Sequence, residues 1–185
     1  MSQSDTPMHI GKAEPTPAIA VAANLRELSH VLGGFSDELY TQADIGPFHS
    51  TIGEHARHCL DHNVAVLRGL ETGTIDYEAR ERGTAVETDR AAAIALAVRL
   101  HDRVATLDAA LLDRPVDVVT MLAAGAPAVQ VRSTVARELA FSLSHTIHHN
   151  AIIAAMARLA GARVPERFGF APSTIAYLDA GSCAP

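Results

Sequence analysis

The amino-acid sequence predicts an all-α protein, a four-helix bundle with a short β-hairpin between its third and fourth helices. Apolar residues make up 48% of the chain and aromatic residues 4%, a balance that suits helices better than a β-sandwich. Four long segments carry apolar residues at helical spacing, joined by short or modest connections. A length of 185 residues is enough for one domain with a hydrophobic core.

The domain is expected to span residues 17–185, preceded by a flexible arm over residues 1–16. This arm is polar and lacks the apolar core of a secretory signal. The two cysteines, Cys59 and Cys183, form no CxxC pair. We therefore expect a reduced, cytoplasmic protein, and no stretch approaches the ~18 apolar residues that a membrane span needs.

The first helix is predicted over residues 18–42, with a kink at its central Gly33–Gly34 pair. After a connector, the second helix is predicted to begin at Ser50 or Thr51 and to end at Thr72. Thr51 and Glu54 have the spacing of a capping box, in which each side chain bonds the other residue's backbone N–H.

A charged linker over residues 74–83 leads to the third helix, predicted over residues 84–112. Its first residues also have the capping-box form, Thr84-x-x-Glu87. Residues 116–131 are rich in β-branched side chains around a Gly–Ala–Pro turn, which predicts the hairpin.

The last long helix is predicted to begin at Ser133 or Thr134 and to end at Gly161. Beyond it, Ser173 has the position to cap a short terminal helix. The segment between them serves as a lid over the open end of the bundle or as a clasp that packs on it.

Histidines gather on one face of the second helix and on one face of the last helix. These residues are spaced three or four positions apart: His55, His58, His62, His145 and His149. Such spacing stacks imidazoles on one helix face, whereas His148 points about 100° away from His149. Two such faces turned toward each other would build a site for Zn²⁺ or Ni²⁺, because these ions favour imidazole nitrogen.

Two other interpretations stay open. The ion could staple two helices together in a non-catalytic structural or interaction module. Alternatively, the histidines are structural residues of a plain helical dimer, which packs through the alanine-rich first and third helices. A lone histidine on an apolar helix face is usually a hydrogen-bonded core or surface residue.

The segments STIGEHARH (residues 50–58) and RELAFSLSHTIHH (residues 137–149) resemble the DinB-like (YfiT-like) superfamily of bacterial metal-binding four-helix bundles. The resemblance covers about residues 18–161. It implies a metal held by His58, His145 and His149. This sequence also offers His62 and His55 on the same stripe as His58, as further possible ligands. It also implies an enzyme that transfers a low-molecular-weight thiol or catalyses a hydrolysis.

Two carboxylates lie close in sequence to these histidines. Asp61 and Glu138 are predicted to hydrogen-bond ligand imidazoles or to act as a general base. The alternative for each is an ion pair, with Arg57 or Arg137. His148 is predicted to lie beside the ligands, either as a neighbour or as a group that hydrogen-bonds a ligand or acts as a general base.

The substrate pocket is predicted to include Tyr77, Arg80 and Ser142. The expected substrate is a small thiol or an ester or amide. The net charge of −6 and the lack of a basic stripe with interleaved aromatic residues argue against a nucleic-acid partner. A homodimer is expected.

Overall fold

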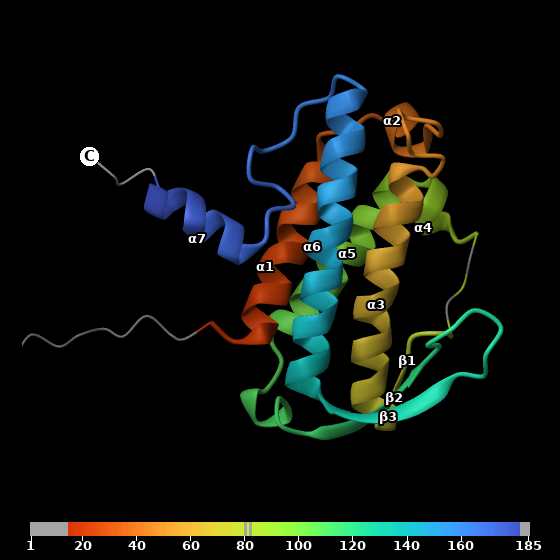
Figure 1. The fold of residues 1–185 in the computed structure, drawn as a ribbon, viewed down its shortest axis with the longest axis vertical. Coiled ribbons are helices and arrows are strands. Elements are labelled where there is room, and N and C mark those ends of the chain that lie inside the picture. Colours follow the sequence, from red (N-terminus) through yellow and green to blue (C-terminus); the bar gives the residue numbers. More distant parts are fainter. Residues whose placement is uncertain (1–14, 80, 82, 182–185) are drawn as a thin grey trace, which may run out of the picture.

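The computed structural model describes residues 15–79, 81 and 83–181 (Figure 1). Within this part the chain is mostly helical, with one small three-stranded sheet. The predicted arm over residues 1–16 lies outside the described residues except for Pro15 and Thr16. No helix in the described part is long and apolar enough to cross a membrane.

Four long helices enclose the core: α1 (Pro17–Gly33), α3 (Ile52–Thr72), α5 (Arg90–Ala105) and α6 (Val135–Leu159). α1 packs against α5 and α6, and α3 packs against the same two helices (Figure 1). Each contributes apolar side chains that are nearly inaccessible to solvent, including Leu28, Leu60, Leu100 and Leu139. Burial of these faces is the main force that holds the helices together.

The predicted first helix is in fact two helices. α1 ends at Gly33, and a short helix α2 (Asp37–Thr41) follows. Ser36 begins α2, because its hydroxyl accepts a hydrogen bond from the backbone N–H of Leu39. The glycine pair therefore ends the helix instead of kinking it, and the prediction of one helix over residues 18–42 is wrong.

The start of α3 is as predicted. The Thr51 hydroxyl accepts a hydrogen bond from the Glu54 N–H at 3.0 Å, and the Glu54 carboxylate accepts one from the Thr51 N–H at 2.7 Å. The last residue of α3 is Thr72, and Gly73 caps the helix. The φ of Gly73 is 79°, a left-handed conformation that glycine adopts without strain.

The predicted third helix is broken near its start. A single turn, α4 (Ala85–Thr88), precedes α5, and the Asp89 carboxylate caps α5 by accepting from the N–H groups of Ala91 and Ala92. The Thr84 side chain makes no capping bond. α5 ends at Ala105, so the prediction of a helix to residue 112 is wrong; only a 3₁₀ turn, η1 (Ala109–Leu111), follows.

The predicted hairpin is present as β2 (Pro115–Thr120) paired antiparallel with β3 (Val129–Thr134). A third strand, β1 (Thr74–Asp76), was not predicted and pairs parallel with β2. Three residues are too few to show the alternation that marks a strand. This strand fixes the start of the charged linker, because the Tyr77 N–H donates to the Val119 carbonyl oxygen.

α6 begins as predicted, with the Thr134 hydroxyl accepting from the Arg137 N–H. The terminal helix α7 runs over Pro172–Gly181, so Ser173 lies inside it and does not cap it. Between α6 and α7, Phe168 is buried in the core, which fastens this segment to the long helices. α7 itself has no buried residue.

Candidate metal centre

Five imidazoles converge between α3 and α6. The two helices pack side by side (Figure 1). The histidine rings predicted on each helix meet between them. Ring centroids of neighbouring histidines in this cluster lie between 4.0 and 5.2 Å apart. The members of this histidine cluster are His55, His58, His62, His145 and His149.

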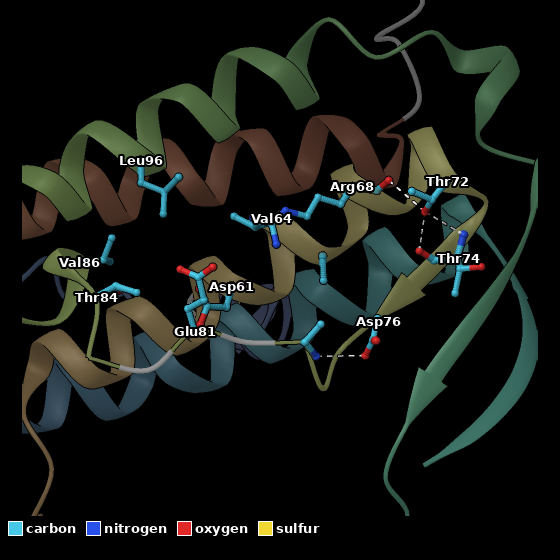
Figure 2. A pocket seen from close by; sticks show the side chains of 12 residues that line it. Asp61, Val64, Arg68, Thr72, Thr74, Asp76, Glu81, Thr84, Val86 and Leu96 are labelled. Carbon is cyan, nitrogen blue, oxygen red and sulfur yellow. Dashed lines mark hydrogen bonds between the residues drawn. The ribbon is translucent and has the colours of Figure 1, made fainter.

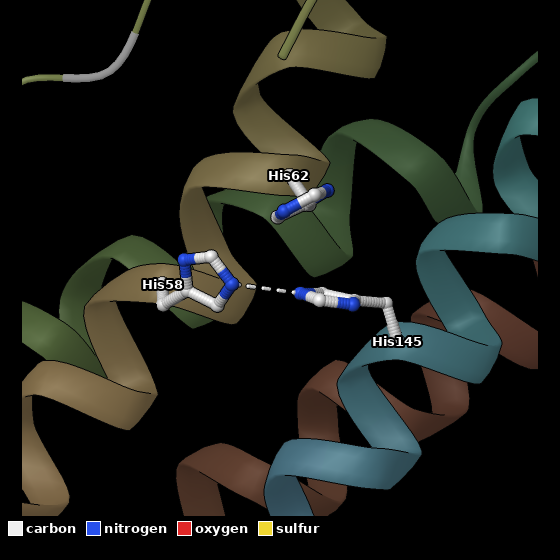
Figure 3. Close-up of side chains that lie close together, drawn as sticks. All are labelled: His58, His62 and His145. Atoms are coloured by element: carbon white, nitrogen blue, oxygen red, sulfur yellow. Dashed lines mark hydrogen bonds between the residues drawn. The ribbon is translucent and has the colours of Figure 1, made fainter. Parts of the chain in front are cut away.

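Three histidines of the cluster are positioned to bind a metal ion. His58, His62 and His145 each offer one ring nitrogen, and these three nitrogens lie within 4.8 Å of one another (Figure 3). The Nε2 atoms of His58 and His145 are 3.0 Å apart. Two nitrogens bound to one zinc ion at ~2.0–2.1 Å are separated by at most about 4.2 Å. Ligands at tetrahedral positions around zinc are about 3.3 Å apart. This separation lies between the 3.0 Å of the His58–His145 pair and the 4.8 Å limit of the trio, so the donors fit a divalent ion.

His149, the third ligand implied by the resemblance, lies directly beside this trio. Its ring centroid is 4.7 Å from those of His58 and His145. Its Nδ1 atom is 2.9 Å from Nδ1 of His55, whose Nε2 atom in turn lies 2.7 Å from the Ser50 hydroxyl. The ligand set His58, His145 and His149 stays a prediction, and the structure groups His62, named from the sequence as a further possible ligand, with His58 and His145.

Burial lowers the pKa of two members of the histidine cluster, His149 and His55. Removal from water, followed by the neighbouring imidazoles, lowers the pKa of His149 to about 3. Burial likewise lowers the pKa of His55. Neutral imidazole is the form that binds metal ions. His148 stands at the exposed edge, with its ring 5.3 Å from that of His149.

A buried carboxylate supports the cluster from one side. Glu138 is 1% exposed and accepts hydrogen bonds from the Tyr77 hydroxyl at 2.7 Å, the Ser133 hydroxyl at 2.6 Å and Arg137 Nη1 at 2.8 Å. The ring of Tyr77 lies 4.9 Å from that of His62. Glu138 thus forms the alternative that was predicted for it, an ion pair with Arg137. It contacts Tyr77, and Tyr77 in turn contacts the ring of His62. Burial, and then the bond to Glu138, raises the pKa of Tyr77.

Asp61 lies on a neighbouring face of α3. It accepts a hydrogen bond from Arg57 at 3.0 Å, and Arg57 also bonds Glu87 at 2.8 Å. Asp61 and Glu81 line a cavity of about 510 Å³ between α3, α5 and the segment after β1 (Figure 2). Arg80, predicted to bind substrate, lies outside the described residues.

Two other side chains near the histidines are fully buried. Ser142, one of the predicted pocket residues, has a hydroxyl with no hydrogen-bond partner in the described part of the chain. Cys59 packs in the core, and burial raises the pKa of its thiol to about 12, so this thiol is no nucleophile.

Two residues that support the histidine cluster were not predicted to do so from the sequence. Phe141 lies 5.9 Å from the ring of His62 and 6.0 Å from that of His145. It precedes His145 by one helical turn, a spacing that could have placed it on the histidine face. Ser133 was considered only as a helix cap, and its bond to Glu138 depends on the tertiary structure.

Comparisons with known proteins agree with this picture. The family model for the DinB superfamily matches residues 20–153. FK506-binding protein 5 of Rhizopus delemar is 32% identical over 105 residues, which are 56% of this chain and 27% of that protein. The chain thus spans about a quarter of the length of this curated relative. No solved structure matches. Since the family model covers most of the chain, including both histidine stripes, the chain belongs to the DinB superfamily.

Proposed function

We propose that this chain is a divalent-metal-dependent enzyme that activates a small thiol for S-transfer or a water for hydrolysis of an ester or amide. In this proposal the four long helices are a DinB-type four-helix bundle, residues 17–185 form one domain, and the protein is a homodimer. The observation that carries the proposal is the convergence of His58, His62 and His145 from two helices within 4.8 Å.

His58 and His145 would supply two ligands, since their Nε2 atoms are already 3.0 Å apart. The third would come from His62, which the geometry favours, or from His149, which the family resemblance favours. An all-nitrogen donor set suits Zn²⁺ or Ni²⁺. When bound at three ligands with an open position, such an ion lowers the pKa of a thiol or water and makes it nucleophilic at neutral pH.

The surrounding residues prepare the site for this chemistry. Tyr77 and Phe141 cover His62 and His145 with aromatic rings, which limits access of water on that side. The bond from Tyr77 to the buried Glu138 carboxylate holds the Tyr77 ring in place against His62. Pre-organised ligands lose little conformational entropy when the ion binds.

A non-catalytic metal module is the second candidate, and the number of imidazoles favours it. His55 and His149 lie next to the trio, so a fourth nitrogen could close the coordination sphere. A closed sphere leaves no position for a substrate and is typical of structural zinc. The visible spectrum of the Co²⁺ form distinguishes four protein ligands from three with an exchangeable position.

Metal content tests the proposal. The purified protein is expected to hold one ion per chain by mass spectrometry of the metals, and His58→Ala and His145→Ala are expected to lose it while keeping their helicity. His49→Ala is the matched control, because the His49 side chain is 91% exposed and lies outside the histidine cluster. Unchanged metal content in both cluster variants would reject the assignment.

A further inference from the structure

A second cavity lies against the histidine cluster, between the β2–β3 hairpin and the first turns of α6. Its volume is about 360 Å³. Tyr77 and Phe141 line this cavity, and the centroids of their rings lie 4.9 Å and 5.9 Å from that of His62. A molecule in this hairpin cavity would therefore lie one aromatic ring away from the candidate metal ligands.

The outer wall of the hairpin cavity is apolar and faces water. Leu122, which follows β2, is 74% exposed. Val131 on β3 is also exposed. Covering apolar surface is favourable by roughly 25 cal/mol for each Å² removed from water. Large apolar side chains exposed at the mouth of a cavity are characteristic of a binding site.

Two arginines line the same cavity. Arg137 is 64% exposed, and its guanidinium is held by Glu138 at one nitrogen and by stacking 5.2 Å above the ring of Phe141. A guanidinium carries five N–H donors, so most of its donors can serve a ligand. Arg132 lies on β3 and contacts Asp117 through Nε at 3.3 Å.

Each arginine of the hairpin cavity has one carboxylate partner: Asp117 pairs with Arg132 and the buried Glu138 pairs with Arg137. Both guanidinium groups are largely exposed, at 86% and 64%, and each ion pair engages one of their nitrogens. The remaining N–H donors can therefore bind an anion, and the planar guanidinium matches the geometry of a carboxylate.

We propose that the hairpin cavity binds a small organic carboxylate with an apolar body, close to the candidate metal ligands. The carboxylate would pair with Arg137 and Arg132, and the apolar body would lie between Leu122, Val131 and Phe141. The binding does not need the metal, so this inference can be tested apart from the proposed function.

Calorimetric titration of the metal-free protein with 3-phenylpropionate tests the binding. We expect saturable binding and an affinity at least about tenfold weaker for the uncharged 3-phenylpropanamide, because a charge-assisted pair is lost. Arg137→Gln and Arg132→Gln are each expected to weaken carboxylate binding by about tenfold. Arg132 is exposed and lies outside the bonds of Glu138, so its variant is informative even if Arg137→Gln folds poorly. Arg99→Gln, on the exposed face of α5, is the matched control.

Equal affinity for acid and amide, or no effect of either cavity variant, would overturn the proposal. The titration is repeated on the Co²⁺-loaded protein, where the probe is expected to shift the visible spectrum of the ion. An unchanged spectrum at saturation would overturn the placement of the ligand close to the metal ligands. Failure to load Co²⁺ would count against the proposed function alone, because binding was measured without metal.

Discussion

Gly53 sits at the first turn of α3, where α4 and the ring of Tyr40 approach the helix most closely. A Cβ at this position would meet the backbone carbonyl of Glu87 and would stand 2.8 Å from Cε1 of Tyr40. Tyr40 cannot easily move away, because it is fully buried and its hydroxyl donates to the Val86 carbonyl oxygen at 2.6 Å. Only glycine permits this contact.

Gly53→Ala is therefore expected to lower the free energy of unfolding by about 2 kcal/mol or more, as overpacking does in dense interiors. Gly33→Ala is the control, since nothing lies within 4 Å of a Cβ added at the end of α1. There, alanine is expected to stabilise by up to about 1 kcal/mol through helix propensity. Urea unfolding measures both changes, and equal effects of the two variants would contradict this account.

At the scale of elements, two threonines with the same sequence signature behave differently. Thr51 and Glu54 exchange the two hydrogen bonds of a capping box at the start of α3. Thr84 has Glu87 at the same spacing, but its side chain makes no capping bond. Glu87 instead accepts from Arg57 and from the Gly83 N–H. A tertiary ion pair has replaced the local bond.

We expect Thr51→Ala to cost about 1 kcal/mol of stability, because an orphaned N–H at the start of α3 loses its acceptor. Thr84→Ala is expected to change stability by less than about 0.5 kcal/mol. The midpoint and slope of urea unfolding give both values. A larger loss for Thr84→Ala than for Thr51→Ala would refute the assignment of the caps.

The long helices were predictable because each buries one face, so apolar residues recur at helical spacing over many turns. The positions where the predicted first and third helices break could not be predicted in the same way. Asp89 interrupts a continuous apolar pattern with a side-chain cap, which local spacing does not distinguish from a helical aspartate. β1 consists of three residues and depends on β2 for its hydrogen bonds, which lie some forty positions later in the chain.

For the whole molecule, an ion in the histidine cluster would link α3 to α6 and would bind the folded state only. Excess Zn²⁺ at about 100 times its dissociation constant should stabilise the fold by about 2.7 kcal/mol. For a chain of this size we expect the melting temperature to rise by roughly 5–10 °C.

Calorimetry with Zn²⁺, with Mg²⁺ and after chelation measures this rise in melting temperature. Mg²⁺ prefers oxygen ligands and should have little effect on the melting temperature. His145→Ala should abolish the response to Zn²⁺. A similar shift with Mg²⁺, or in the variant, would show that the stabilisation does not come from the imidazoles.

The convergence of the imidazoles was predictable from the sequence. The histidines lie on one face of each helix, so they meet whenever α3 and α6 pack with those faces together. The sequence did not allow the choice between His62 and His149, since both lie on the facing stripes and ring positions depend on neighbours such as Tyr77. The role of Glu138 also depended on the position of Tyr77, which is set by the unpredicted strand β1.

The order of the helices along the chain has a consequence for biosynthesis. α3, which carries His55, His58 and His62, is synthesised well before α6, which carries His145 and His149. The sheet, α4 and α5 are synthesised between them. Until then the three imidazoles of α3 have no facing partners, and stray cations would bind them only weakly. An ion that binds the histidine cluster would therefore be captured late in synthesis, when the last long helix packs against α3.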